Sequence, residues 1–280
     1  MAEAERARFL IVNADDFGLA PAIDAGILAA YEQGIVSSTT LIVTLPGAEA
    51  AAAALRSLPD AEARSRSAPA LPGMPLGVGL HLNLSLGKPL SPAAEVPSLV
   101  ADDGRFSRDA EALLPSAAAE EIERELRMQM ARFSRLLGRL PTHLDAHKHL
   151  DRFPAVREAM LRCASLHALP LRAALPATRA ACRAAGVRHT TAFLGDYFLS
   201  GSEQPPAWTE AKLVHAILNL QSGWTELMCH PGRLAQDEAP PTSYSWQRVE
   251  ELRGLCAPAV REALARAGVR LASYAGLALA

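Results

Sequence analysis

The sequence predicts an α/β fold, a (β/α) barrel or a distorted version of one, and two observations carry this prediction. Short apolar runs typical of buried strands alternate with segments of helical periodicity along most of the 280 residues. About seven or eight strands can be counted, most of them followed by a helix, which suits a barrel of this length. Such alternation implies parallel strands joined by right-handed crossovers. No internal repeat or linker is visible, so we expect residues 1–280 to form a single domain.

Strands are predicted where a compact apolar run is bounded by turn residues, and helices where apolar residues recur at helical spacing. By these criteria the predicted strands are 9–12, 39–43, 76–84, 141–149, 169–172, 190–194, 225–229 and 270–273. The predicted helices are 21–32, 48–58, 117–137, 154–167, 177–185, 208–220 and 246–267. Residues 59–75 are rich in Ala, Arg, Ser and Pro without apolar periodicity, so we expect a surface excursion there.

Local signals set the boundaries of the clearest elements. Pro21 opens the first helical pattern, and Gly34 closes it. The amphipathic helix 117–137 is capped by Gly138, and Pro141 prevents its continuation. The glycines of strand 76–84 allow another backbone or a ligand to come close.

Composition and charge argue against several classes of protein. Half of the residues are hydrophobic and the formal net charge is −2, so electrostatics gives no reason to expect a nucleic-acid partner. The four cysteines are scattered without CxxC spacing, which is typical of reduced thiols in a cytoplasmic protein. Residues 1–8 lack the apolar run of a signal peptide, and no window approaches the ~20 apolar residues of a transmembrane helix. We therefore expect a cytoplasmic protein without a transmembrane segment.

The segment 141–149 carries the most unusual pattern in the chain. His143, Asp145, His147 and His149 occupy every second position, and in an extended strand they would all point to one face. Three imidazoles and a carboxylate are costly to bury unless something binds them. A metal ion is the simplest explanation, and the alternative is a hydrogen-bonded strand end.

Other ionisable side chains recur where predicted strands end. The set is Asp15, Asp16, His81, His147, His149 and His230. The carboxyl ends of parallel strands form the active face of such folds. We therefore expect these groups to lie close together at that end of the barrel. Each also has a simpler interpretation: the aspartates could cap the helix at Pro21 or form an Asx turn, and the histidines could be edge or turn residues.

One aspartate and two histidines with open positions match a catalytic metal centre better than a closed structural one. Two adjacent carboxylates repel, so we expect one of Asp15 and Asp16 to bind the ion and the other to act as a base. Zinc suits these ligands, and magnesium or another divalent metal fits as well. Such an ion lowers the pKa of bound water and polarises a carbonyl. His230 would then protonate a leaving amine, which describes an amide hydrolase.

Four segments, in the same order and across nearly the whole chain, resemble the YdjC/ChbG-type carbohydrate deacetylases. They are LIVNADDFG at 10–18, GLHLNL at 79–84 followed by GKP at 87–89, PTHLDAHKH at 141–149 and MCHPG at 228–232. The resemblance implies a distorted (β/α) barrel of the polysaccharide-deacetylase type. It also implies metal-dependent removal of N-acetyl groups from amino sugars such as chitooligosaccharides, by attack of metal-bound water on the amide carbonyl.

By the same resemblance, the metal ligands are Asp16, His81 and His147, with Asp15 as the base and His230 as the acid. Four further residues are expected to support the ligands or to hold substrate, and they are Asp145, Asn83, His149 and Arg172. Many relatives carry a run of histidines after the ligand, which Lys148 and Asp151 interrupt here. This departure weakens any metal-binding role for that rim.

The substrate is the least readable property of the chain. The segment 195–206, with 208–210 after it, resembles the branch of the family associated with hopanoid biosynthesis, which implies a glycolipid substrate as an alternative to a free acetylated sugar. Two other function classes stay open: an esterase or phosphoesterase with the same metal site, and a non-catalytic protein that binds sugar or metal. The oligomeric state is also open, and a homodimer is one option.

Overall fold

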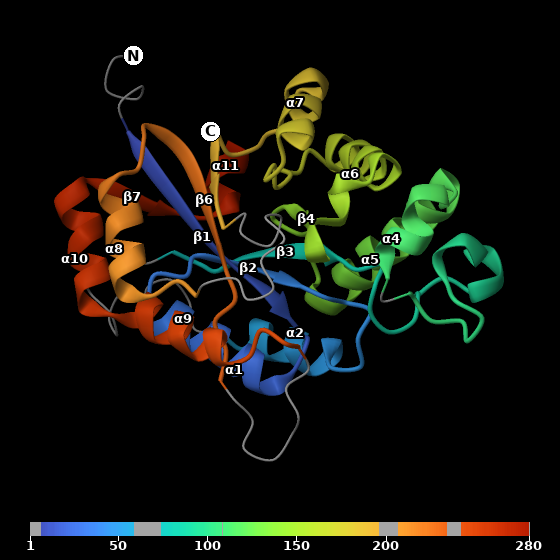
Figure 1. The fold of residues 1–280 in the computed structure, drawn as a ribbon, viewed down its shortest axis with the longest axis horizontal. Coiled ribbons are helices and arrows are strands. Elements are labelled where there is room, and N and C mark those ends of the chain that lie inside the picture. The colour runs from blue at the N-terminus through green and yellow to red at the C-terminus, as the bar shows by residue number, and fades with distance from the viewer. Residues whose placement is uncertain (1–6, 59–73, 108, 196–206, 234–241, 280) are drawn as a thin grey trace.

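The computed structural model describes residues 7–58, 74–107, 109–195, 207–233 and 242–279 (Figure 1). The surface excursion expected at 59–75 and the segment 195–206 therefore lie almost wholly outside the described residues. In the part that is described, strands and helices alternate along most of the chain, as the sequence predicts.

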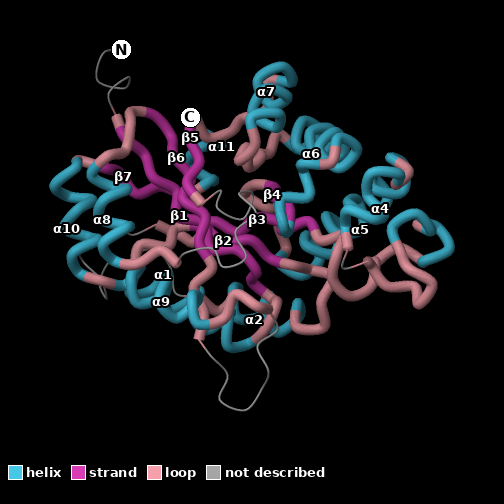
Figure 2. The backbone as a smooth tube through the Cα atoms, in the orientation of Figure 1, coloured by secondary structure: helices cyan, strands magenta, loops and turns pink. Residues whose placement is uncertain are grey.

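The described strands form one parallel sheet of seven strands in the order β4-β3-β2-β1-β6-β5, with β7 paired to β1. They are β1 (Arg8–Phe17), β2 (Ser38–Leu41), β3 (Gly77–Leu82), β4 (Leu144–Ala146), β5 (Ala192–Leu194), β6 (Gly223–Cys229) and β7 (Val269–Ala272). β6 follows one edge of β1, while β7 and β2 share its other edge. The sheet curls without a hydrogen-bonded ladder between β4 and β5, which confirms the distorted (β/α) barrel (Figure 2).

Helices surround this sheet (Figure 1). They are α1 (Pro21–Gln33), α2 (Ala48–Arg56), α4 (Ala110–Leu113), α5 (Ala119–Leu137), α6 (Pro154–His167), α7 (Pro176–Ala185), α8 (Glu210–Leu218), α9 (Trp246–Cys256), α10 (Pro258–Ala267) and α11 (Tyr274–Leu279). Two packed series account for most of the outer layer, one from α2 through α5 and α6 to α7, the other from α1 through α9 and α8 to α10.

The burial pattern follows the sequence. Leu10, Ile11 and Val12 of β1 are fully buried, as expected for a strand covered on both faces. The apolar face of α5, including Ile122 and Phe133, is also buried.

The four cysteines are free, as predicted. None of the described helices combines the length and apolarity required to cross a bilayer. That residues 1–280 form a single domain remains a prediction.

Three predicted elements need correction. The strand expected at 141–149 is extended only at Leu144–Ala146, and a 3₁₀ turn at His147–Arg152 replaces its end. The helix expected at 246–267 breaks into α9 and α10, because Pro258 cannot donate the hydrogen bond that would continue α9. The strand expected at 169–172 amounts to a single bridge between Leu144 and Leu171.

Candidate functional site

The ionisable residues singled out in the sequence lie together at the carboxyl ends of the strands. Asp15 and Asp16 end β1, His81 lies in β3, His147 follows β4 and His230 follows β6. All are buried except His147, which is partly exposed. The four sequence segments thus contribute to one cluster, because parallel strands present their carboxyl ends at the same side of the sheet.

A bulge in β1 separates the two adjacent aspartates. The pairing of β1 with β2 shifts register between Ala14 and Phe17, and Asp16 takes a positive φ of 72°. A bulge re-aims side chains that would otherwise alternate regularly between the two faces. Asp15 consequently contacts Arg172, whereas Asp16 contacts the histidines.

Asp16, His81 and His147 form a candidate metal centre. Asp16 Oδ1 lies 3.1 Å from His147 Nδ1 and 3.5 Å from His81 Nε2, and the two ring nitrogens are 3.3 Å apart. The ligand atoms of all three residues lie within 4.8 Å of one another. One carboxylate and two imidazoles are donors that suit zinc and related divalent ions, so the residues fit the expected cation.

Asp145 fixes the orientation of His81. Its Oδ1 lies 2.7 Å from His81 Nδ1, which leaves Nε2 directed at Asp16. Thr40, which was not predicted, donates to Asp145 Oδ2 at 3.1 Å. Burial disfavours the charged ring, but Asp145 outweighs it and raises the pKa of His81 to about 10. A ligating imidazole must be neutral at its donor nitrogen, so a bound cation would take the place of that second proton.

Arg172 binds the other aspartate. Its guanidinium reaches both oxygens of Asp15 at 2.6 Å, Asp145 at 2.8 Å and Glu226 at 2.7 Å. Burial opposes ionisation of Asp15, but Arg172 holds the pKa of that carboxyl well below its usual range. Asp15, His81 and Asp145 also approach closely enough to hold an ion. Because Arg172 already bridges the two aspartates, we assign a guanidinium and not a second metal to that position.

His230 completes the cluster from the segment after β6. Its backbone N–H donates to Glu251, and its ring meets Tyr244 edge-on at 5.5 Å between centroids. Burial lowers the pKa of His230 to about 4, so the ring is neutral near pH 7. A proton that it donates must therefore reach it during the reaction.

Asn83 and His149 are the remaining predicted residues, and each has contacts of its own. The Asn83 amide is engaged by Thr44, Ser85 and Leu86, which fixes the turn after β3. The His149 ring is buried and lies edge-on to Phe193 at 5.9 Å. These contacts give Asn83 a local structural task, whereas the role of His149 stays a prediction.

His143 is fully buried and lies apart from the candidate metal centre. Its ring stacks on Tyr274 with centroids 3.8 Å apart, and a Cβ added to Gly79 would lie 2.5 Å from the ring. Gly79 therefore leaves the space that the imidazole occupies. His143 takes no part in the candidate metal centre.

Several residues of the cluster were not predicted from the sequence. Arg248 of α9 reaches Asp16 Oδ2 at 2.6 Å, and Glu251 lies one turn further along the same helix. Charged residues on a helix usually face solvent, so nothing marked these two. Glu226, by contrast, is an acidic residue within the apolar strand 225–229. Its position in the sequence could have indicated a buried polar partner.

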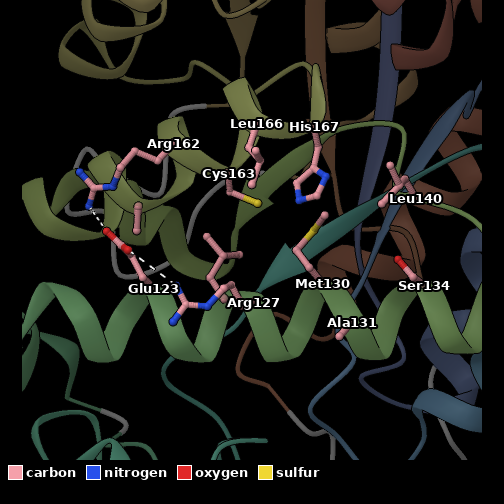
Figure 3. A pocket seen from close by; sticks show the side chains of 12 residues that line it. Glu123, Arg127, Met130, Ala131, Ser134, Leu140, Arg162, Cys163, Leu166 and His167 are labelled. Carbon is pink, nitrogen blue, oxygen red and sulfur yellow. Dashed lines mark ion pairs between the residues drawn. The ribbon is translucent and has the colours of Figure 1, made fainter.

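Two surface cavities on the described part of the chain lie away from this cluster. One of about 320 Å³ lies between α5 and α6 and is lined by Leu126, Met130, Cys163 and their neighbours (Figure 3). Another of about 560 Å³ lies beside β5 and α8. None of the predicted site residues lines either cavity, so the site is identified by its chemistry and not by the size of a hollow.

Comparisons with known proteins identify the family of the chain. The family model described as YdjC-like protein matches residues 9–266. A carbohydrate deacetylase of Geobacillus stearothermophilus is 36% identical over 268 residues, covering 95% of this chain and 97% of the relative. A chitooligosaccharide deacetylase of Serratia marcescens is 36% identical over 277 residues, covering 96% and 99%. The crystal structure of a protein from Enterococcus faecalis V583 superposes with a TM-score of 0.80 at 28% identity, covering 97% of this chain and 99% of that one. The chain therefore belongs to the YdjC-like protein family.

Proposed function

We propose that this protein is a metal-dependent carbohydrate deacetylase that removes N-acetyl groups from amino sugars. The observation that carries the proposal is the convergence of Asp16, His81 and His147 on one point, with Asp15 and His230 close by. Relatives named as carbohydrate and chitooligosaccharide deacetylases span almost the same length and support the choice of substrate class. Zinc is the ion we expect, with magnesium or another divalent metal as the alternative.

The roles of the residues follow from their chemistry. Asp16, His81 and His147 would hold the cation, which when bound lowers the pKa of water and polarises the amide carbonyl. Asp15 stays ionised beside Arg172 and accepts a proton as water adds to the carbonyl carbon. The C–N bond then breaks, and His230 receives the proton that Asp15 took from water and passes it to the leaving amine. Arg172 and Asp145 keep Asp15 and His81 in place throughout.

The test is acetate release from short N-acetylglucosamine oligosaccharides by the metal-loaded protein. We expect a chelator to abolish release and added zinc to restore it, because the cation supplies the polarisation of the carbonyl. His81→Ala should lose both metal and activity. His215→Ala serves as the matched control, because His215 lies exposed on α8.

Different outcomes would support the other function classes. Faster hydrolysis of acetyl esters or phosphate esters than of amides would favour an esterase or phosphoesterase. Tight metal binding without turnover of any acetylated sugar or glycolipid would favour a binding protein and contradict the proposal.

A further inference from the structure

We propose that Arg248 restricts Asp16 to binding the cation through one oxygen, and so keeps a coordination position open for water or substrate. The two oxygens of Asp16 already have separate partners. Oδ2 pairs with Arg248 Nη2 at 2.6 Å, while Oδ1 faces His147 Nδ1 at 3.1 Å and His81 Nε2 at 3.5 Å. The inference rests on the proposed function, because it assigns a task to a residue outside the ligand set.

The guanidinium of Arg248 is held firmly in this position. Its Nε donates to the Tyr244 carbonyl at 2.9 Å, and its Nη1 approaches the His230 carbonyl at 3.5 Å. The residue is only 4% exposed, and its Cδ lies 3.1 Å from where a Cβ on Gly232 would be. The planar guanidinium donates in fixed directions, and the rest of the Arg248 side chain is packed. Arg248 therefore cannot move away from Asp16 Oδ2 without losing its other contacts.

A carboxylate that binds through both oxygens uses two positions around a small divalent ion. Catalytic centres of this donor type keep three protein ligands and leave the remaining position to water or substrate. With Oδ2 engaged by Arg248, the cluster offers three ligand atoms and no fourth from Asp16. Arg248 is therefore a positioning residue, which acts through Asp16 and also ties it to the segment that carries His230.

Arg248→Met tests this directly, because methionine keeps much of the buried stem and removes every donor. Wild type and variant would be loaded with cobalt and examined by X-ray absorption, which counts the ligands around the ion. We expect one additional oxygen ligand in the variant, at unchanged metal stoichiometry, and acetate release lower by about 10–100-fold. Arg253→Met is the matched control: it lies on the same helix, its side chain is 73% exposed, and we expect it to behave as wild type.

Two further measurements keep the proposal testable if Arg248→Met fails to fold. Arg248→Gln keeps a polar side chain but is too short to place a donor where Nη2 pairs with Asp16 Oδ2, so the additional ligand is again expected. The metal-loaded wild type alone is also informative: Asp16 bound through both oxygens would overturn the inference. So would either variant with the wild-type ligand count and wild-type turnover.

Failure of the proposed function gives a different result. A wild-type protein that binds one ion at this centre but releases no acetate contradicts the deacetylase assignment, while the ligand count still decides the role of Arg248. A wild-type protein that binds no ion overturns both.

Discussion

At the scale of single residues, Asp15 and Asp16 stand out in the sequence, but only the structure shows which partner each of them contacts. The pair could be recognised as unusual because two adjacent carboxylates after a buried strand need a reason to stay ionised. Which partner each one takes depends on the bulge and on Arg172 and Arg248, which come from distant parts of the chain. No local pattern encodes those contacts, so Arg248 could not be predicted.

Asp15→Asn tests the assigned base. The amide cannot accept a proton, so we expect turnover to fall by about 10²–10⁴-fold. Metal content should not change, because Asp15 lies outside the ligand set. Acetate release and elemental analysis of the purified variant measure the two quantities, with the exposed Asp102→Asn as control. Turnover within a few-fold of wild type would show that another group takes the proton.

His149→Gln tests how the buried His149 ring makes the stability of the metal-free protein depend on pH. Burial lowers the pKa of His149 to about 3, whereas the unfolded chain binds the proton below about 6.5. Wild type therefore loses stability through this group as the pH falls below 6.5, and the variant does not. We expect the variant to gain about 2 kcal/mol relative to wild type between pH 7 and pH 5. Urea unfolding at both pH values measures this difference, and a pH-independent difference would mean that His149 titrates normally.

At the scale of elements, the alternation in segment 141–149 predicts the first part of the segment correctly and the second part wrongly. Alternation correctly placed Asp145 of β4 against His81, and His143, which directly precedes β4, is also buried. Alternation failed from His147 onward, where Lys148 and His149 adopt left-handed φ values of 54° and 50°. Two consecutive non-glycine residues of this kind are disfavoured locally, so tertiary contacts must hold the turn. The break at Pro258, by contrast, was readable from the proline itself.

Gly26→Ala tests how α1 positions the His230 segment. A Cβ at Gly26 would lie 2.4 Å from Gly232 Cα, so one of the two backbones must shift. We expect the free energy of unfolding to fall by about 1–3 kcal/mol and acetate release to fall with it. Chemical denaturation and the acetate assay measure the two effects.

Gly276→Ala is the matched control for that substitution. Its added Cβ would meet only Trp224 at 3.6 Å, an ordinary contact within α11, and alanine favours the helix by up to about 1 kcal/mol. Equal stability of the Gly26→Ala variant and wild type would mean that α1 and the segment can separate without cost.

At the scale of the whole molecule, topology brings four separate sequence segments to one site. The barrel could be predicted because alternating apolar runs and helices leave few arrangements for a chain of this length. The alternation does not show where the sheet stays open, because that depends on how short strands such as β4 and β5 end and pair. The sugar is not encoded in any local pattern either, because specificity depends on connecting segments that carry no periodicity.

The most direct test of the central claim is a crystal structure of the zinc-loaded protein with the ion located by anomalous scattering. We expect one ion bound by Asp16 Oδ1, His81 Nε2 and His147 Nδ1, with Asp15 and His230 on either side of the open position. An ion held by other residues, or no ion in protein that releases acetate, would contradict it.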